Sequence, residues 1–228
     1  MTNNTANNTA NNTTNNTTDT ATNNATINPA SNSIGDNLTA SIDSTASKSN
    51  GTAVAVFAGG CFWCTEAVFE QLAGVVDVVS GYAGGSEETA SYRVVCSGTT
   101  RHAEVIRIEY DPTRISFEQL LDVFFDTHDP TTLNRQGNDI GPQYRSAIFV
   151  ATESERALAA AKIAGLNAKG KFPRPIVTTI EPLDRFFPAE QYHQDYARRH
   201  PEEPYIQFQA WPKVCKVRDK HPGLVRAI

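Results

Sequence analysis

The first 50 of the 228 residues contain no aromatic residue, no arginine and no cysteine, and they carry very few charges. They consist of NNTA and NNTT repeats followed by a stretch rich in Ser, Thr and Ala. Because a segment with so little apolar surface cannot offset the entropy lost on ordering, we expect residues 1–50 to be a disordered leader. The leader also lacks the basic and apolar runs of a secretory signal peptide and the arginines of a mitochondrial presequence.

Long apolar runs are missing from the whole chain, and none is long enough to cross a bilayer. The formal net charge of -5 gives no electrostatic reason to expect nucleic acid or an anionic membrane as a partner. Only four cysteines are present, which argues against a disulfide scaffold and for catalytic, redox or metal chemistry. Together these absences favour a cytoplasmic protein with no nucleic-acid or membrane partner, and a monomer is the simplest expectation.

Residues 51–228 have the composition of one globular domain of ordinary size. Apolar runs rich in β-branched residues predict strands at 52–60, 75–85, 102–112, 144–152 and 175–184. Helical spacing and capping signals predict helices at 61–74, 116–130, 153–170 and 189–200. Residues 130–143 read as a long loop. Several strands lack a helix between them, which favours an α+β fold over a doubly wound one: a two-layer mixed sheet with packed helices, with a ferredoxin-like core and extensions.

The stretch GCFWCTE, residues 60–66, is the candidate for chemistry. Cys61 lies where a glycine turn meets a predicted helix, a position that lowers a thiol pKa and predicts a reactive thiolate rather than a buried, inert cysteine. Cys64 follows one turn later, so the pair is able to serve a thiol–disulfide oxidoreductase. In those enzymes, however, the Trp usually precedes the first cysteine. Zinc would need two further ligands at suitable spacing, so no metal is expected.

Five motifs along the chain resemble those of the peptide methionine sulfoxide reductase A family. They are GCFWCTEAVFE, GYAGG, YRVVCSGTTRHAEV, YDP and HDPTTLNRQGNDIGPQYRSAIF, and the resemblance covers nearly all of residues 54–220. The resemblance implies an oxidoreductase of protein repair under oxidative stress, which reduces methionine S-sulfoxide, free or in proteins. It further implies thioredoxin as the reductant and no cofactor.

The resemblance also implies a role for each residue that matches the family's pattern. Cys61 matches the nucleophile, Phe62 and Trp63 match the aromatic wall for the S-methyl group, and Glu104 matches the acid. In such chemistry a thiolate attacks the sulfoxide sulfur while a neutral carboxylic acid protonates the oxygen. The acid then needs a raised pKa, which burial supplies. Without the resemblance, the plainer interpretations are core aromatics and a solvated glutamate.

Three further residues match the same pattern. Tyr92 and Tyr144 match two phenols that face the sulfoxide oxygen, and Asp139 matches a carboxylate that organises the site. Taken alone, the tyrosines would be core residues and Asp139 a turn residue.

The sequence departs from the family's pattern at Arg101, where Gly is common before HAE, and a bulky cation there is able to alter the turn or the pKa of the acid. The attack leaves a sulfenic acid, so a second thiol must restore the enzyme. The candidates for this resolving cysteine are Cys64, Cys215 and Cys96. Local reach slightly favours Cys64, whereas analogy of position favours Cys215; direct reduction by an external thiol is a further alternative.

Overall fold

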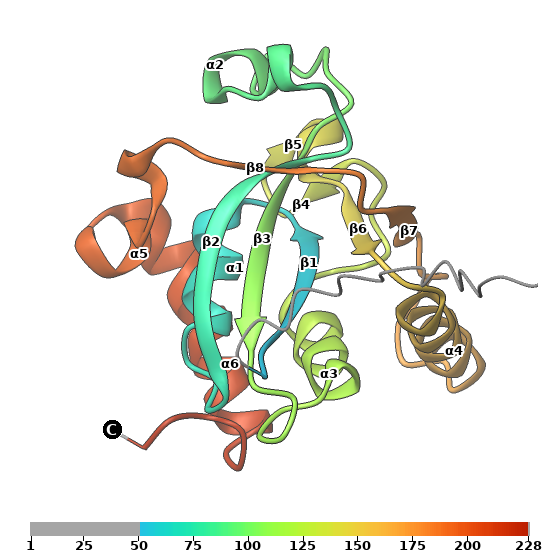
Figure 1. The fold of residues 1–228 in the computed structure, drawn as a ribbon. Coiled ribbons are helices and arrows are strands. Elements are labelled where there is room, and N and C mark those ends of the chain that lie inside the picture. The colour runs from blue at the N-terminus through green and yellow to red at the C-terminus, as the bar shows by residue number, and fades with distance from the viewer. Residues whose placement is uncertain (1–50, 228) are drawn as a thin grey trace, which may run out of the picture. The chain divides into compact units, whose positions relative to one another are not determined.

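The computed structural model describes residues 51–227, so the leader expected over residues 1–50 lies outside the described residues. Six strands form the main sheet, in the order β7-β6-β1-β3-β2-β8 (Figure 1). Their bounds are β1 Ala53–Gly59, β2 Val75–Ala83, β3 Ala103–Tyr110, β6 Ser146–Val150, β7 Thr179–Pro182 and β8 Phe186–Pro188. Neighbouring strands are antiparallel except β6 and β7, which are parallel, so the sheet is mixed as expected.

The central four strands follow the order β6-β1-β3-β2 and are joined by two helical crossovers. One crossover carries α1 between β1 and β2, and the other carries α3 between β3 and β6. This is the ferredoxin-like arrangement predicted from the sequence, and the α+β fold class is confirmed. The helices are α1 Phe62–Phe69, α2 Tyr92–Val95, α3 Phe117–Thr127, α4 Glu153–Ala168, α5 Tyr196–Arg199 and α6 Trp211–Lys220.

β1 is buried on both faces, which explains why its sequence is an uninterrupted apolar run. Ala55 and Phe57 point into the main core with α1, α3 and α6, whereas Val56 and Ala58 belong to a second apolar cluster. The alternation follows from the two-residue period of a strand.

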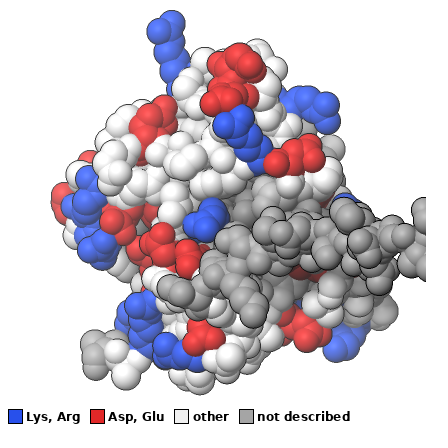
Figure 2. Space-filling model, viewed as in Figure 1, with Lys and Arg blue, Asp and Glu red and all other residues white. Residues whose placement is uncertain are grey.

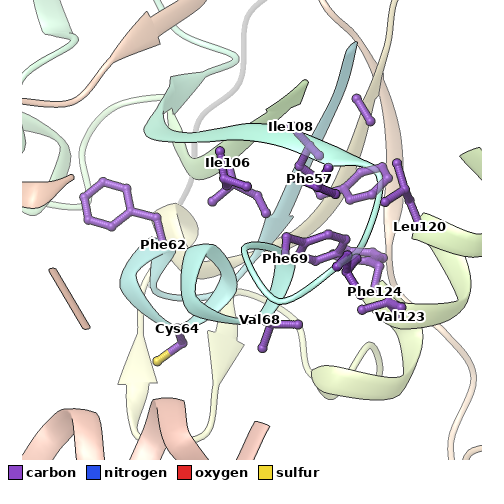
Figure 3. Packing of buried hydrophobic residues seen from close by; sticks show 14 of the residues in the cluster. Phe57, Phe62, Cys64, Val68, Phe69, Ile106, Ile108, Leu120, Val123 and Phe124 are labelled. Atoms are coloured by element: carbon purple, nitrogen blue, oxygen red, sulfur yellow. The ribbon is translucent and has the colours of Figure 1, made fainter. Parts of the chain in front are cut away.

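Three phenylalanines anchor the main core at the level of the helices (Figure 3). Phe57 of β1 contacts Phe124 of α3 with ring centroids 5.0 Å apart, and Phe69 of α1 with centroids 5.8 Å apart. Each fully buried Phe stabilises the fold by about 1.5–3 kcal/mol, so these contacts fix α1 and α3 firmly on the sheet.

The predicted start of the second helix is confirmed in atomic detail. Ser116 Oγ accepts a hydrogen bond from the Gln119 N–H at 3.2 Å, and Gln119 Oε1 accepts one from the Ser116 N–H at 2.8 Å. These reciprocal bonds form a capping box, which satisfies two donors at the start of α3.

The sequence-based prediction was wrong in several details. The helix expected over 189–200 is instead the 3-10 turn Gln191–His193 followed by the short helix α5. The first helix ends at Phe69 rather than continuing to Gly74. The loop expected over 130–143 contains a short hairpin, with β4 Arg135–Gln136 and β5 Asp139–Ile140, and the 3-10 turn Pro142–Tyr144. Strands of two residues are too short to produce a recognisable period, which explains why the hairpin was not predicted.

Acidic and basic side chains are interspersed over the part of the surface that the described residues form in Figure 2. Of the helices between residues 51 and 227, none combines the length and the apolar character needed to cross a membrane.

Candidate functional site

A pocket of about 170 Å³ lies at the start of α1, against β3 and the β4–β5 hairpin. All seven residues singled out for catalysis or substrate binding line it, together with one that the sequence did not indicate. They are Cys61, Phe62, Trp63, Tyr92, Glu104, Asp139, Tyr144 and Tyr205. The structure therefore brings together residues that lie up to 144 positions apart in the sequence.

The glycine pair before Cys61 is required by the local geometry. Gly60 has φ +91°, and a Cβ atom there would lie 2.6 Å from the side chain of Gln136. Gln136 cannot easily move away, because its amide group bonds the backbone N–H and C=O of Asp129, both at 3.1 Å. A side chain at position 60 would displace this turn, so Gly60 sets the position from which Cys61 enters the pocket.

Glu104, on β3, is the buried acid of the pocket and is only 2 % exposed. Its Oε2 accepts a hydrogen bond of 3.0 Å from the backbone N–H of Phe62, the first residue of α1. Burial raises the pKa of Glu104 to about 8, with smaller contributions from Asp139 and Cys64, whereas the Phe62 N–H opposes the rise. The carboxyl is therefore mostly protonated at pH 7 and able to donate a proton.

Burial also raises the pKa of the Cys61 thiol, with Cys64 and Glu104 adding to the rise and Tyr205 opposing it. This is opposite to the direction predicted from the helix start. The physical reason is that the thiol is desolvated, while the first N–H of α1 is bound to Glu104 rather than free for the sulfur. Cys61 is thus a thiol at neutral pH.

The three tyrosines of the pocket remain protonated phenols, because burial raises the pKa of each of them well above its usual value. Tyr92 begins α2 and Tyr144 ends the 3-10 turn after the β4–β5 hairpin. The Tyr205 hydroxyl donates a 2.6 Å hydrogen bond to Asp139 Oδ2. The pocket therefore offers phenol donors from separate segments of the chain beside the carboxyl of Glu104.

Tyr205 is the site residue that sequence reasoning missed. It directly precedes the π-helical turn Ile206–Ala210 in the C-terminal part of the chain, and its sequence surroundings look like those of a core aromatic. Its hydroxyl contacts Asp139 and lies 4.0 Å from the Cys64 sulfur, so its place is set by tertiary packing.

Trp63 and Phe62 form an apolar wall supported from behind. Tyr196 of α5 stacks on Trp63, with ring centroids 3.9 Å apart and an interplanar angle of 11°. The Trp63 Nε1–H donates a 3.2 Å hydrogen bond to His193 Nδ1, and the His193 ring packs 5.1 Å from that of Phe62. The wall is thus held in one orientation by aromatic contacts and one hydrogen bond.

The four cysteines are free and have different surroundings. Cys64 is 1 % exposed, and its pKa is lowered chiefly by a hydrogen bond with the Cys61 thiol. Cys64 points away from the Phe69 and Phe124 rings of the core (Figure 3). Cys96 is half-buried beside Tyr92, while Cys215 is exposed on α6. Of the three candidates for a resolving cysteine, Cys64 alone is next to Cys61.

Arg101 does not act on the acid of the pocket. It is exposed, and the carboxylate that it helps to stabilise is Glu181, whose pKa is lowered mainly by Arg145 and Thr179 and to a smaller extent by Arg101. Burial, Asp139 and Cys64 account for the raised pKa of Glu104. Within residues 51–227, no group of three or more His, Cys, Asp or Glu side chains is arranged to hold a metal ion.

Comparison with known proteins gives one consistent result. Residues 53–223 match the family model described as peptide methionine sulfoxide reductase. A peptide methionine sulfoxide reductase MsrA of Haloquadratum walsbyi is 56% identical over 165 residues, which cover 72% of this chain and 94% of the relative. The one of Ralstonia nicotianae is 52% identical over 189 residues, covering 81% of this chain and 99% of the relative.

Two solved structures extend the similarity to the fold. The reduced form of Mxr1 from Saccharomyces cerevisiae superposes with a TM-score of 0.63 at 38% identity, over 67% of this chain and 88% of that protein. Methionine sulfoxide reductase A of Corynebacterium diphtheriae gives a TM-score of 0.60 at 36% identity, over 68% of this chain and 77% of that protein.

Proposed function

The chain belongs to the peptide methionine sulfoxide reductase family, and we propose that its pocket reduces the S epimer of methionine sulfoxide, free or in proteins, through Cys61. It is accordingly an oxidoreductase that acts on methionine sulfoxide. One observation carries the assignment of the site: the Cys61 thiol, the buried Glu104 acid and the phenols line the same small pocket.

The proposed reaction begins with attack of the Cys61 sulfur on the sulfoxide sulfur. This attack forms an S–S bond, and Glu104 protonates the sulfoxide oxygen. The S–O bond of the substrate then breaks as the hydroxyl passes to the Cys61 sulfur, and the electron pair of the S–S bond returns to the substrate sulfur, which leaves as the thioether of methionine. Cys61 is thereby oxidised to a sulfenic acid, and its thiol proton returns to Glu104. The raised pKa values of Glu104 and Cys61 are consistent with this order of steps, since both protons are already at the site.

Stereochemical selection follows from an arrangement with three points of contact. The apolar wall of Phe62 and Trp63 contacts the methyl group, and Cys61 approaches the sulfur. The hydroxyl groups of Tyr92, Tyr144 and protonated Glu104 donate hydrogen bonds to the sulfoxide oxygen. Only one epimer is able to satisfy all three while the rest of the substrate points to solvent. Membership of the family supports the S epimer.

Regeneration is assigned to Cys64 in this proposal. Side chains three residues apart on a helix have Cβ atoms about 5–6 Å apart, and a disulfide needs about 3.5–4.5 Å, so a small shift of Cys61 at the helix start suffices. The Cys64 sulfur attacks the sulfenic sulfur and a disulfide forms, while the hydroxyl takes the proton of the Cys64 thiol and leaves as water. A dithiol protein of the thioredoxin class then reduces this disulfide. The exposed Cys215 and the half-buried Cys96 are the alternatives.

The test uses the purified full-length chain with dithiothreitol and the separated S and R epimers of N-dabsyl methionine sulfoxide. We expect reduction of the S epimer only, loss of activity in Cys61→Ser, and full activity in the matched surface control Cys215→Ser with dithiothreitol. Equal activity on both epimers, or an active Cys61→Ser, contradicts the proposal.

The pair Cys61 and Cys64 also supports a second candidate, a thiol–disulfide oxidoreductase. That activity predicts reduction of insulin disulfides that depends on both cysteines and is unaffected by Glu104→Gln. Measuring insulin reduction beside sulfoxide reduction in the same preparations distinguishes the two functions. A cytoplasmic location and a monomeric state remain predictions.

A further inference from the structure

Glu66, on α1, is a buried carboxyl that lies outside the pocket. It is only 1 % exposed, and neither carboxyl oxygen has a hydrogen-bond partner among the described residues. The hydroxyl of Ser80 on β2, which is completely buried, also lacks a partner within residues 51–227. A buried carboxyl without partners weakens a fold when it is ionised, so stability does not explain its presence.

The groups that face Glu66 come from α1, α5 and β2. They are Glu70 at the end of α1, Asp195 and Arg198 of the α5 segment, and Ser80 of β2. Burial raises the pKa of Glu66 to about 7, although the N–H groups of Asp195 and Tyr196 and the Ser80 hydroxyl lie near enough to oppose the rise.

Glu70 adds a second carboxyl of similar behaviour. Burial, the Asp195 carboxylate and Glu66 raise the pKa of Glu70 to about 8. Two cations lie near these carboxyls. Arg198 pairs with Asp195 at 2.7 Å, and at 67% side-chain exposure its charge is screened by solvent. Arg226 lines the same hollow as Glu70 and Asp195, and its guanidinium donates hydrogen bonds to backbone carbonyls. Three carboxyls therefore lie close together where α5 packs on α1, and they do not repel one another as long as the two glutamates are neutral.

The same contact between α1 and α5 supports the aromatic wall of the pocket. Trp63 lies one helical turn before Glu66 on α1, and Tyr196, which stacks on Trp63, directly follows Asp195. Asp195 itself has φ +55°, a left-handed conformation that a non-glycine residue holds only when its surroundings enforce it. Adjacent residues therefore connect Glu66 to the Tyr196–Trp63 stack.

We propose that Glu66 is a positioning residue: in its neutral form it lets α5 close on α1 and hold Tyr196 against Trp63, and its ionisation loosens that stack. The direction of the pH effect on this contact follows from the charges of Glu66, Glu70 and Asp195. Below neutral pH Glu66 is protonated and the contact is closed. As the pH rises above neutrality, a negative charge appears beside Asp195 and, at higher pH, beside ionised Glu70. The kinetic consequence rests on the proposed role of Trp63 in substrate binding, whereas the structural consequence does not.

Tryptophan fluorescence tests the structural part without substrate. The chain has two tryptophans, so Trp211→Phe leaves Trp63 as the single reporter. We expect its emission to change between pH 6 and pH 9 in two steps, one near pH 7 from Glu66 and one near pH 8 from Glu104, which lines the same pocket as Trp63. Glu66→Gln should abolish the step near pH 7. The matched control Glu104→Gln should abolish the step near pH 8 and leave the step near pH 7 in place.

Kinetics test the link to the site. From pH 6 to pH 8.5 we expect the KM for N-dabsyl methionine S-sulfoxide to rise by about two- to tenfold, the worth of one aromatic pair, and to stay flat in Glu66→Gln. The alkaline fall in kcat, which belongs to Glu104, should be the same in both proteins. Glu66→Met, which is apolar and of similar volume, serves as a second variant and should behave like Glu66→Gln.

A folded Gln or Met variant that keeps the fluorescence step near pH 7 and the pH-dependent KM of the parent overturns the inference. Loss of folding in both variants overturns it too, because a neutral side chain at this position is predicted to be tolerated at every pH. An enzyme inactive on sulfoxide that still shows the Glu66-dependent transition refutes the proposed function and leaves this inference standing.

Discussion

Replacing Glu104 by Gln separates the charge of the buried acid from its shape. Gln keeps a carbonyl oxygen that accepts from the Phe62 N–H, the 3.0 Å bond that links β3 to the start of α1. It cannot ionise, so any effect of pH on stability that arises from Glu104 disappears in the variant. Stability as a function of pH therefore reports directly on whether this carboxyl is neutral in the folded protein.

The magnitude follows from the pKa of Glu104, which burial raises from 4.5 to about 8. Between these values the folded protein keeps a proton that the unfolded chain has released, so stability is lost as the pH rises through this range. At 1.36 kcal/mol per pKa unit, the difference of about 3.5 corresponds to about 5 kcal/mol. About 3 kcal/mol of this loss falls between pH 5.5 and pH 9.

The assay is urea unfolding at pH 5.5 and pH 9, in a Cys61→Ser background that removes the neighbouring thiol. Glu66 and Glu70 also have raised pKa values, of about 7 and about 8, but they are present in both proteins and cancel in the comparison. Between pH 5.5 and pH 9, we expect the free energy of unfolding of Glu104→Gln to fall by about 3 kcal/mol less than that of its parent. If parent and variant lose the same free energy of unfolding to within about 1 kcal/mol, which is close to the error of the urea extrapolation, Glu104 is not neutral in the folded protein.

The same substitution predicts a catalytic effect in the enzyme with Cys61 intact. Loss of a general acid lowers the rate of the chemical step by about 10²- to 10⁴-fold, so kcat for the S-sulfoxide should fall by that amount. In the parent, kcat should decline above about pH 8 as Glu104 loses its proton. Single-turnover release of methionine measures the rate of the chemical step in both cases, and a variant with the parental rate would exclude Glu104 as the acid.

Three further predictions concern regeneration, the C-terminal tyrosine and the glycine turn. Cys64→Ser should release one equivalent of methionine but lose turnover driven by thioredoxin; if Cys215→Ser has that phenotype instead, Cys64 is not the resolving cysteine. Tyr205→Phe removes the 2.6 Å bond to Asp139 and should cost about 1.5–3 kcal/mol of stability in urea unfolding while raising KM; an unchanged variant would mean the bond is dispensable. Gly60→Ala should lose about 1–3 kcal/mol and most of its activity, and parental stability would argue against the need for φ +91°.

The elements that could be predicted are those with enough residues to show a pattern. β1 was recognisable as an apolar run because it is buried on both faces, and α3 because Ser116 and Gln119 form its capping box. Three short strands were not recognisable, since two or three residues contain no period. They are Phe186–Pro188 and the hairpin strands Arg135–Gln136 and Asp139–Ile140. Helix α6 also escaped prediction, because only Val214 and Val217 of its ten residues are buried.

The charge states of the site were beyond the reach of local sequence. A helix start predicts a lowered thiol pKa at Cys61, but the structure desolvates that thiol and directs the first helical N–H to Glu104, 42 positions away from Phe62. Tyr205 joins the pocket from the far end of the chain, and its partner Asp139 lies 66 positions before it. Such contacts depend on how the sheet and the C-terminal segment pack.

The amino-acid sequence by itself determined the chemical groups, the family and the presence of a Gly-Gly-Cys turn, because motifs and turns are properties of a few adjacent residues. It also indicated the α+β class from the order of its strands and helices. Only the tertiary structure decided which groups are neutral, which cysteine touches Cys61 and which tyrosine completes the pocket. The physical reason is that desolvation and charge–charge interactions act between side chains that are close in space and distant in sequence.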